Sequence, residues 1–574
     1  MIERMTKYSW IVPSVDKENF LSVLRTLGVV DIRRSSKPVD SRSEEMLCGI
    51  EDVRDRMTCI RKGSDKHLEE LLAERKDLAS AVSRLEPWGE FDCGALRSLG
   101  VDVRFCRVDR KRFDDSWKED FAICEISADK EYVYFVALDA PGFAKYELTL
   151  PEMTLSGAVK ALAEKDGEIE AYRHELEGGR ADLPELERLL AARQSELSLY
   201  LAGVTGKAAA DDYLQIFEGF APVAERERLE AEFNGLPALW FAEDATVDDN
   251  PPVKLRNNRF VSQFEVLTSM YGLPSYNEFD PTVFLSIFFL LFFAMCMGDA
   301  GYGLVLMAVG YFLRGKDSGL GRIWRLIVIL GAGTTAVGFV MGGFFGVNLA
   351  EQAWMPECLK KCMITGNITI GGSSYAKQMV LSLLIGVLHI CLALIMKAVW
   401  TVRKDGFRNS LSALGWTLLI VGAVVSLSVW LPGLISETAL KWTLIGIGGV
   451  SALGILLFNQ WGRNPLKNIG SGLWDTYSMA SGLMGDVLSY IRLYALGLSG
   501  GLLGATFNKM AGMVLGDNPV WQWIPFVLIV VFGHVLNIAM SCLGAFVHPL
   551  RLNFVEFFKN SSYEGKGREY NPVK

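Results

Sequence analysis

The placement of apolar residues divides this chain of 574 residues into two parts that must fold in different surroundings. From Pro281 onward, apolar runs of about 20 residues follow one another as far as Phe558, and each run is long enough to cross the hydrocarbon core of a bilayer as a helix. Residues 1–275 are dense in charge and contain no run of that length. We therefore expect a soluble domain over 1–275, a transmembrane domain over 276–558 and a cytoplasmic C-terminal tail over 559–574.

Two segments of the soluble domain have the heptad pattern of a coiled coil. In residues 41–86 and 154–202, apolar side chains recur along one seam, and Glu, Lys and Arg occupy the positions between them. We expect the two segments to form an antiparallel helical arm, which at about 45 residues would reach roughly 65 Å. Gly178, Gly179 and Pro184 should bend the second helix.

Shorter, strand-like runs lie on either side of the arm segments. Those in residues 88–152 predict a distal lobe between the two arm helices, and those in 1–38 and 205–260 predict a proximal lobe. The expected fold class is α+β in the N-terminal half, with two small α/β lobes joined by a long antiparallel coiled coil, followed by an all-α polytopic membrane domain. A charge-rich, solvated spacer is the alternative interpretation of the arm.

Charge and motifs exclude several classes of function for the soluble domain. The formal net charge is −8 and no large basic block occurs, so nucleic acid is not an expected partner. There is no phosphate-binding loop, GxSxG elbow or HExxH motif, and the ten cysteines lack zinc or haem spacing, so we expect neither a catalytic centre nor a cofactor. The first residues lack the apolar core of a signal peptide, which favours a cytoplasmic location for this domain.

The membrane domain contains eight predicted helices. Their approximate ranges are 282–298, 301–314, 324–348, 377–400, 411–431, 441–459, 475–510 and 521–558. Basic residues concentrate in the connections 314–325, 397–408 and 459–470, so the positive-inside rule places both termini in the cytoplasm. The first two helices are short and meet at Met297-Gly-Asp-Ala-Gly-Tyr-Gly303, so one broken hairpin is the alternative there. The last two have about 36 residues each and must tilt strongly or project from the bilayer.

Arg492 lies near the middle of the seventh predicted helix. Placing a guanidinium at the centre of a bilayer costs from about 3 to more than 10 kcal/mol, and arginine does not lose its proton to avoid that cost. Such a charge indicates an ion pathway or a buried partner. The other residues on this face, at alternating steps of four and three, are mostly small or polar: Ser478, Gly482, Gly485, Ser489, Leu496 and Ser499.

The eighth predicted helix repeats this pattern. Its stripe consists of His534, Asn537, Ser541, Gly544, His548 and Arg551. Close packing of helices through small residues is the alternative explanation of such stripes, and we favour it for Gly482, Gly485 and Gly544 taken alone. Because each stripe also holds polar residues in register with an arginine, we expect a water-lined ion path.

Three further polar residues have more than one interpretation. His389, alone in the fourth predicted helix, is expected to be a packing residue. Asp299 is expected to cap a helix, with a place in an aqueous cavity as the alternative. Asp486 lies about 120° around the helix from Arg492, so it either pairs with a basic group on another helix or lies in a cytoplasmic vestibule.

Five segments of the chain resemble the membrane stator subunit of the vacuolar/archaeal-type rotary ATPases, which is called subunit I in bacteria and archaea and subunit a in eukaryotes. The segments are Pro251–Phe260, Met270–Pro281, Met297–Leu304, Leu488–Leu496 and Phe546–Phe557. The resemblance implies that Arg492 faces a rotating ring of proteolipid subunits, that Arg551 is the second intramembrane arginine of the family, and that His548 matches a histidine of the same helix. The layout of a cytoplasmic arm followed by eight helices resembles the family over essentially the whole chain.

The chain departs from the eukaryotic pattern of this family at four positions. Eukaryotic members have a glutamate where this chain has Ser541, a glutamate and an asparagine where it has Ser478 and Gly482, and a histidine where it has Gly500. The identity of the acidic groups in the two half-channels is therefore open. The candidate residues for ion translocation are Arg492, Arg551, His548, Ser541, Asn537, His534, Ser489, Ser499, Asp486 and Glu556.

The resemblance also implies partners and a location. The expected partners are the proteolipid (c/K) ring, the peripheral-stalk subunits E and G, the C/d subunit of the central stalk, the catalytic A/B head through those stalks, and the lipid bilayer. The expected location is the plasma membrane of a bacterium or archaeon, and the transported ion is H⁺ or Na⁺. One alternative is a secondary transporter that binds an anionic substrate through Arg492 and His548, although the internal repeats typical of transporters are not evident. Another is a membrane-anchored scaffold.

Overall fold

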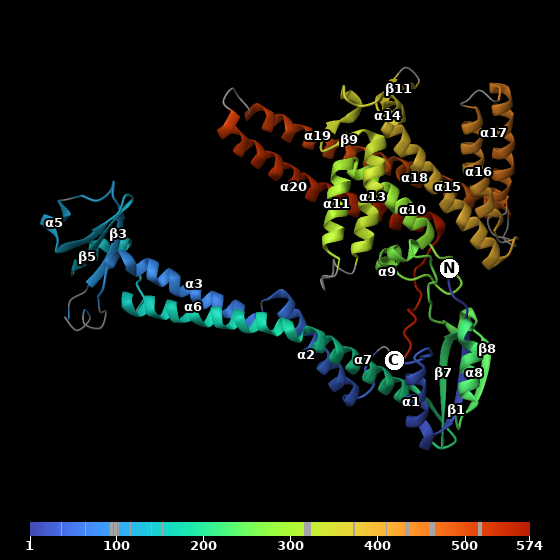
Figure 1. The fold of residues 1–574 in the computed structure, drawn as a ribbon, viewed down its shortest axis with the longest axis horizontal. Coiled ribbons are helices and arrows are strands. Elements are labelled where there is room, and N and C mark those ends of the chain that lie inside the picture. The colour runs from blue at the N-terminus through green and yellow to red at the C-terminus, as the bar shows by residue number, and fades with distance from the viewer. Residues whose placement is uncertain are drawn as a thin grey trace. The chain divides into compact units, whose positions relative to one another are not determined.

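The structure is a computed structural model of the chain, drawn as a ribbon in Figure 1. It describes residues 1–573 except for 36, 64, 92–95, 97–99, 101–102, 115, 139–140, 152, 315–322, 371–372, 409, 431–434, 458–464 and 515–518. The chain divides into two compact units. One unit consists of Met1–Trp10, Val29–Asp31 and Glu218–Pro572, and the other consists of Ile11–Gly28, Ile32–Phe217 and Val573–Lys574.

The predicted arm consists of four helices in two pairs. Helix α2 (Ser41–Lys62) packs on α7 (Leu183–Thr205), and α3 (Lys66–Leu85) packs on α6 (Leu155–Gly178). Each pair joins a helix of the first heptad segment to a helix of the second, so the predicted pairing of the two segments is confirmed. The buried residues of the seams include Ile50, Val53, Met57, Ile60, Leu68, Leu71 and Ile169.

Both arm segments are broken near their middle. The first break occurs at Gly63, whose left-handed φ of 66° ends α2, so the prediction of one continuous helix over 41–86 is wrong. Asp65 then starts α3 by accepting a hydrogen bond from a backbone N–H of the first turn, and it also accepts one from the Tyr172 hydroxyl at 2.6 Å. That hydrogen bond lowers the pKa of Asp65 and raises the pKa of Tyr172 to about 12. In the second segment the 3₁₀ turn η4 (Gly179–Asp182) separates α6 from α7, near the predicted bend.

The predicted distal lobe contains a three-stranded antiparallel sheet in the order β3-β5-β4. Its strands are β3 (Val103–Asp109), β4 (Ile123–Ala128) and β5 (Tyr132–Leu138). Residues 101 and 102, directly before β3, lie outside the described part of the chain. The buried core beside this sheet includes Cys106, Val108, Val133, Phe135, Ala137 and Phe143.

The predicted proximal lobe is built on a sheet in the order β2-β7-β1-β8, with β6 paired to β7. The strands are β1 (Met5–Pro13), β2 (Asp31–Ile32), β6 (Lys207–Ala209), β7 (Leu214–Pro222) and β8 (Leu239–Asp244). Two helices, α1 (Lys17–Leu27) and α8 (Arg226–Phe233), each follow a strand of this sheet along the chain. Within the first unit, Tyr8 stacks on Trp10, and Phe233 contacts both rings edge-on.

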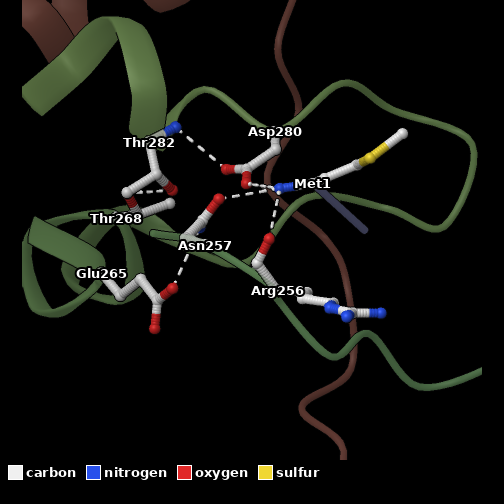
Figure 2. Close-up of polar contacts among 7 residues, drawn as sticks. All are labelled: Met1, Arg256, Asn257, Glu265, Thr268, Asp280 and Thr282. Atoms are coloured by element: carbon white, nitrogen blue, oxygen red, sulfur yellow. Dashed lines mark hydrogen bonds and ion pairs between the residues drawn. The ribbon is translucent and has the colours of Figure 1, made fainter. Parts of the chain in front are cut away.

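Polar contacts tie together the segments that lead into the membrane domain (Figure 2). Asp280 accepts a hydrogen bond at 3.0 Å from the N–H of Thr282, the first residue of α10, and it also binds the amino group of Met1. Asn257 accepts a hydrogen bond from the same amino group at 2.8 Å. The hydroxyls of Thr268 and Thr282 are buried and lie 3.0 Å apart. These contacts hold two of the segments that carry the family resemblance against the start of α10.

Six helical segments of the described chain are long and apolar enough to cross a membrane, and two more apolar helices are shorter. The long segments are Trp324–Met341, Lys377–Lys404, Leu411–Trp430, Glu437–Leu456, Asn468–Val514 and Trp521–Ser561. The short helices, α10 (Thr282–Met297) and α11 (Ala300–Phe312), meet at Gly298 and Asp299. Each of these segments overlaps one of the eight predicted helices. At least half of each of the predicted connections, 314–325 and 459–470, lies outside the described residues.

The third predicted helix is shorter than expected. Helix α13 (Trp324–Met341) ends where Gly342 adopts a left-handed φ of 80°, so the predicted end at residue 348 is wrong. The chain continues into two short antiparallel strands, β9 (Gly343–Phe344) and β10 (Val347–Asn348).

The seventh predicted helix is broken two residues before Arg492. It consists of α18 (Pro465–Ser489) and α19 (Ile491–Val514), so the prediction of a single helix is wrong. At the break, the N–H groups of Tyr490 and Leu493 bond to carbonyls three residues before them, at 3.2 and 3.1 Å. Such locally tightened turns within a helix often mark functional positions.

The eighth predicted helix changes its winding after its last arginine. Helix α20 (Pro519–Arg551) is followed by the π-helix η10 (Leu552–Phe557) and by α21 (Phe558–Ser561). Pro549 has no N–H to donate, and the Asn553 side chain donates to the Pro549 carbonyl at 2.8 Å. Both long helices are therefore irregular beside an arginine.

Helix α10 packs against α13, α19 and α20. Helix α15 (Lys377–Asp405) packs against α16 (Leu411–Trp430), which packs against α17 (Glu437–Ala452). His389 of α15 is fully buried among aromatic rings, which confirms its predicted packing role. The buried core of the bundle includes Phe289, Phe292, Phe293, Tyr490, Leu493, Ala545 and Leu552.

The predicted C-terminal tail is held against other parts of the first unit. Arg568 forms an ion pair with Asp31 at 2.9 Å, and Asp31 is almost fully buried. A backbone bridge joins Gly567 to Leu273, in the segment before α10. The tail therefore connects the end of the last membrane helix to the sheet and to the junction shown in Figure 2.

Candidate functional site

Arg492 lies near the start of α19 and is half-buried. Its Nη2 donates a hydrogen bond to Ser489 Oγ at 3.2 Å, and its Nη1 is buried without a hydrogen-bond partner. Among the described residues, no carboxylate forms an ion pair with this guanidinium. A buried charged group without a counter-charge is costly, so the missing partner of Nη1 is a feature that a function must explain.

A serine hydroxyl connects Arg492 to an acid of the following helix. Ser489 Oγ, which accepts from Arg492, donates to Glu556 Oε1 at 2.9 Å. Glu556 is 3% exposed, and its Oε2 is buried without a partner. The hydroxyl thus bridges a cation and a carboxylate that are not themselves paired, and the second carboxylate oxygen has no hydrogen-bond partner among the described residues.

Asn560 continues this connection to Asp486. Its side-chain N–H groups donate to the Glu556 carbonyl at 2.6 Å and to Asp486 Oδ2 at 2.8 Å. Asp486 also forms an ion pair with Lys559 at 4.0 Å, so pairing with a basic group of another helix is confirmed. The four residues Ser489, Glu556, Asn560 and Asp486 are called the carboxylate path below.

A cavity of about 420 Å³ adjoins the carboxylate path. Asp486 lines it together with Ser478 and Gly482, which are spaced four residues apart and lie along one side of α18. Lys397 of α15 and Asp475 of α18 also line it. The structure therefore brings the first part of the predicted stripe to a polar cavity, with an acid one helical turn beyond Gly482.

Three residues of the second predicted stripe form a hydrogen-bond network. His534 Nδ1 lies 2.8 Å from the Tyr302 hydroxyl, and its Nε2 lies 3.0 Å from Asn508 Oδ1. Asn537 donates to the Tyr302 hydroxyl at 2.8 Å, and Ser541 Oγ donates to Asn537 Oδ1 at 3.3 Å. These five residues are called the tyrosine–histidine network below.

Sequence reasoning missed two members of this network. Tyr302 lies within the Met297–Leu304 segment. The resemblance of this segment to the family indicated that the segment contributes to the site. Asn508 lies on α19 outside the predicted stripe, and no sequence feature indicated that it belongs to the site. Gly504 makes room for the network, because a Cβ atom there would lie 3.0 Å from the Tyr302 hydroxyl.

Asp299 is both a helix cap and a cavity residue, so both of its predicted interpretations apply. Its carboxylate accepts four backbone hydrogen bonds at 2.8–3.1 Å, two from the first turn of α11 and two from Phe345 and Gly346. It lines a second cavity of about 360 Å³, which extends to Tyr494 of α19. The four donors leave this buried carboxylate well satisfied.

The remaining predicted site residues belong to neither the carboxylate path nor the tyrosine–histidine network. His548 is half-buried and within electrostatic range of Arg492 and Arg551, and Arg551 is exposed. Ser499 is exposed and donates to the Leu496 carbonyl of its own helix at 2.9 Å. In the part of the chain that the structure describes, no three His, Cys, Asp or Glu side chains are grouped so that they could hold a metal ion.

Comparison with known proteins agrees with the resemblance. A family model described as the V-type ATPase 116kDa subunit family matches residues 218–324. The A-type ATP synthase subunit I of Methanocaldococcus jannaschii is 29% identical over 468 residues, which cover 75% of this chain and 66% of that protein. The V-type ATP synthase subunit I of Chlamydia trachomatis is 25% identical over 653 residues, covering 97% of this chain and 96% of that protein. Its counterpart in Borreliella burgdorferi is 24% identical over 628 residues, covering 100% and 99%.

A solved structure of the cytoplasmic N-terminal domain of subunit I, homolog of subunit a, of V-ATPase also matches, with 15% identity over 42% of this chain and 100% of that chain. The TM-score of this match is 0.20. The similarity to the two bacterial proteins extends over nearly the full length of all three chains, and the family model matches the segments that lead into the membrane domain. The chain therefore belongs to the subunit I family of the V/A-type rotary ATPases, whose eukaryotic homologue is subunit a.

Proposed function

We propose that this chain is the membrane stator of a V/A-type rotary ATPase, in which Arg492 faces the carboxylates of a rotating proteolipid ring. In this role it couples H⁺ or Na⁺ translocation to the hydrolysis or synthesis of ATP, which takes place on other subunits. The observation that carries the proposal is the unpaired side of Arg492, whose buried Nη1 has no partner and whose guanidinium has no ion pair with an acid of the described chain.

The chemistry follows from the charge of the guanidinium. A ring carboxylate that faces lipid is neutral, with a proton or a cation bound, because an isolated charge is costly there. An opposite charge within about 4–6 Å lowers the pKa of a carboxyl group by about 1–3 units, so the ion leaves when the carboxylate reaches Arg492. Arginine keeps its own proton throughout, and its fixed charge repels cations that would otherwise leak between the two half-channels.

The carboxylate path forms the cytoplasmic half-channel in this proposal. Glu556 is joined to Arg492 by one hydroxyl, and Asn560, which bonds to the main-chain carbonyl of Glu556, holds Asp486 at the edge of the 420 Å³ cavity. An ion released beside Arg492 would pass these acids and enter the cavity. This route replaces the acidic group that the eukaryotic pattern has at the position of Ser478.

The tyrosine–histidine network forms a wall of the opposite half-channel. Hydroxyl, imidazole and amide groups each both accept and donate hydrogen bonds, so the network is suited to pass a proton or to hold the water molecules that carry one. Ser541 stands at its inner end, where the eukaryotic pattern has a glutamate, and His548 lies two helical turns further toward Arg492.

The arm and the lobes hold the stator against rotation. The paired helices, α2 with α7 and α3 with α6, support the role of a stiff strut. In this proposal the lobes bind the peripheral-stalk subunits E and G, which connect to the A/B head, and the C/d subunit of the central stalk lies nearby. The N-terminal domain and both termini are cytoplasmic, and the membrane is the plasma membrane of a bacterium or archaeon.

Removal of the Arg492 charge tests the proposal. In the intact complex reconstituted in vesicles, Arg492→Ala should leave every subunit of the complex in place and abolish ATP-driven ion transport. Arg492→Lys should lose most of the transport, because a buried lysine releases its proton readily. Transport measured with and without Na⁺ identifies the ion. ATP-driven pumping by the alanine variant would contradict the proposal, and ATP-independent uptake of an anionic solute would favour a secondary transporter.

A further inference from the structure

His389 and Tyr490 form a buried pair close to Arg492. His389 lies in α15, Tyr490 lies at the break between α18 and α19, and both side chains are 0% exposed. The His389 Nδ1 and the Tyr490 hydroxyl oxygen are 2.9 Å apart, and the other ring nitrogen, Nε2, has no hydrogen-bond partner. The imidazole therefore directs its hydrogen bond to the residue at which the helix is broken.

Helix α15 is shaped to receive the tyrosine ring. Gly386 lies one turn before His389, so the two residues share a face of the helix. A Cβ atom at Gly386 would lie 2.3 Å from Cγ of Tyr490, so any larger residue at this position would displace the ring. Gly386 and His389 together form a socket that fixes Tyr490 by shape and by a hydrogen bond.

The same imidazole contacts the second irregular helix. Its ring stacks on Phe557, with centroids 4.6 Å apart and an angle of 6° between the planes, and the Phe288 centroid lies 4.2 Å away. Phe557 is the last residue of η10, which begins directly after Arg551 and also contains Glu556. The His389 side chain thus contacts both irregular turns, the break beside Arg492 and the π-helix beside Arg551.

We propose that His389 is a positioning residue for Arg492, which it holds through Tyr490 at the break and through Phe557 in η10. The inference rests on the proposed function of Arg492. Tyr490 is the residue between Ser489 and the first turn of α19, so its position sets how the guanidinium lies relative to the carboxylate path. Without the hydrogen bond, the rings remain packed but the break is no longer held in one geometry.

Two variants remove the hydrogen bond and keep the aromatic packing. Tyr490→Phe deletes one oxygen atom, and His389→Phe replaces the imidazole by a ring of similar shape. Thr417→Val is the matched control, because the Thr417 hydroxyl also bonds to α15, at the Leu394 carbonyl at 3.1 Å, but touches neither irregular turn. Arg492→Ala serves as the reference for lost translocation.

The main readout is the number of ions transported per ATP hydrolysed by the assembled complex in vesicles. Each single variant should lower this ratio by about threefold to tenfold, the range that the loss of one hydrogen bond allows. The coupling ratio of the double variant should be no lower than that of the more impaired single variant, because both substitutions remove the same interaction. The control should match the wild type.

A second readout reports the break itself. Leu488 and Leu502 are 56% and 59% exposed and flank the break, so spin labels attached to cysteines at these positions, on a cysteine-free background, measure the distance across it. Tyr490→Phe should broaden the distance distribution, whereas Thr417→Val should leave it unchanged. A residue with a packing role alone would change neither this distribution nor the coupling ratio.

The outcomes separate this inference from the proposed function. If Arg492→Ala loses transport while both single variants couple like the wild type, the positioning role is overturned and the stator role stands. If Arg492→Ala transports ions normally, the proposed function fails and the positioning role fails with it. If His389→Phe does not assemble, Tyr490→Phe carries the test. If neither assembles, the pair is required for folding rather than for positioning, and the inference is overturned.

Discussion

The two sides of Arg492 differ in their chemistry. The carboxylate path contains two acids, and one of them, Glu556, is buried with an unpaired oxygen. The tyrosine–histidine network consists of neutral hydroxyl, imidazole and amide groups, each hydrogen-bonded to the next. The acid that lies beside the network, Asp299, is already occupied by four backbone N–H groups.

This difference indicates separate tasks for the two sides. An ion that leaves a ring carboxylate beside Arg492 needs an acceptor of comparable strength, and a carboxylate held one hydroxyl away meets that need. On the other side, a permanent negative charge close to Arg492 would pair with it and cancel the charge that acts on the ring. Neutral groups deliver protons or water there without cancelling it.

The largest effect should come from the carboxylate path. Glu556→Gln keeps the size of the side chain and an oxygen for Ser489 Oγ to bond, but it removes the proton acceptor. ATP-driven transport by the reconstituted complex should fall by about 100-fold, the lower end of what a positioned acid or base contributes. Asp486→Asn should cost less, because Asp486 borders a cavity in which water can take over its role. Near-normal transport by the Glu556 variant would show that this acid is structural.

A smaller effect is expected from the tyrosine–histidine network. Tyr302→Phe removes the hydroxyl to which both His534 and Asn537 bond, and His534→Gln keeps a polar group of similar reach. Transport should fall by about threefold to tenfold in each, because water can replace a neutral relay group. The double variant should not multiply the two losses, since the residues act through a shared contact. A loss as large as that of Glu556→Gln would remove the contrast between the two sides.

The smallest effect is expected at Ser489, the residue of the carboxylate path that links its acids to Arg492. Ser489→Ala breaks the hydroxyl link from Arg492 to Glu556 and should lower the coupling ratio by about twofold to fivefold, the lower part of the range for the loss of one hydrogen bond. Ser499→Ala is the matched control on α19, because Ser499 is exposed and bonds within its own helix. Its effect should stay within about twofold, as for other exposed substitutions. Equal effects of the two substitutions would show that the bridge has no special role.

The stripe on α20 was predictable because its polar residues recur at helical spacing inside an apolar sequence. His534 and Asn537 bond to other helices, and Ser541 lies against Gly500 of α19, as the period requires. The hydrogen-bond partners of such a stripe come from other helices, and the spacing of residues along one helix does not identify them. Tyr302 could be predicted as a site residue only from its family motif. Asn560 belongs to the carboxylate path and Lys397 lines its cavity because of tertiary packing, which the local sequence does not indicate.

The breaks beside the arginines were not predictable from local sequence. Tyr490 is neither glycine nor proline, so nothing in Ser489-Tyr-Ile-Arg492 signals the end of a helix. The break depends on a glycine and a histidine in α15, about 100 residues earlier in the chain, which hold the tyrosine ring. Ser499, the last residue of the predicted stripe, is exposed and bonds within its own helix, so it lies outside both the carboxylate path and the tyrosine–histidine network.

The most direct test of the central claim is a map of the assembled complex, at a resolution that shows side chains, with a proteolipid of the ring next to α19. The account predicts that the Arg492 guanidinium lies within about 4–6 Å of the ring carboxylate, with Ser489 still between it and Glu556. A guanidinium that instead forms a direct ion pair with Glu556 or Asp486, away from the ring, would contradict it.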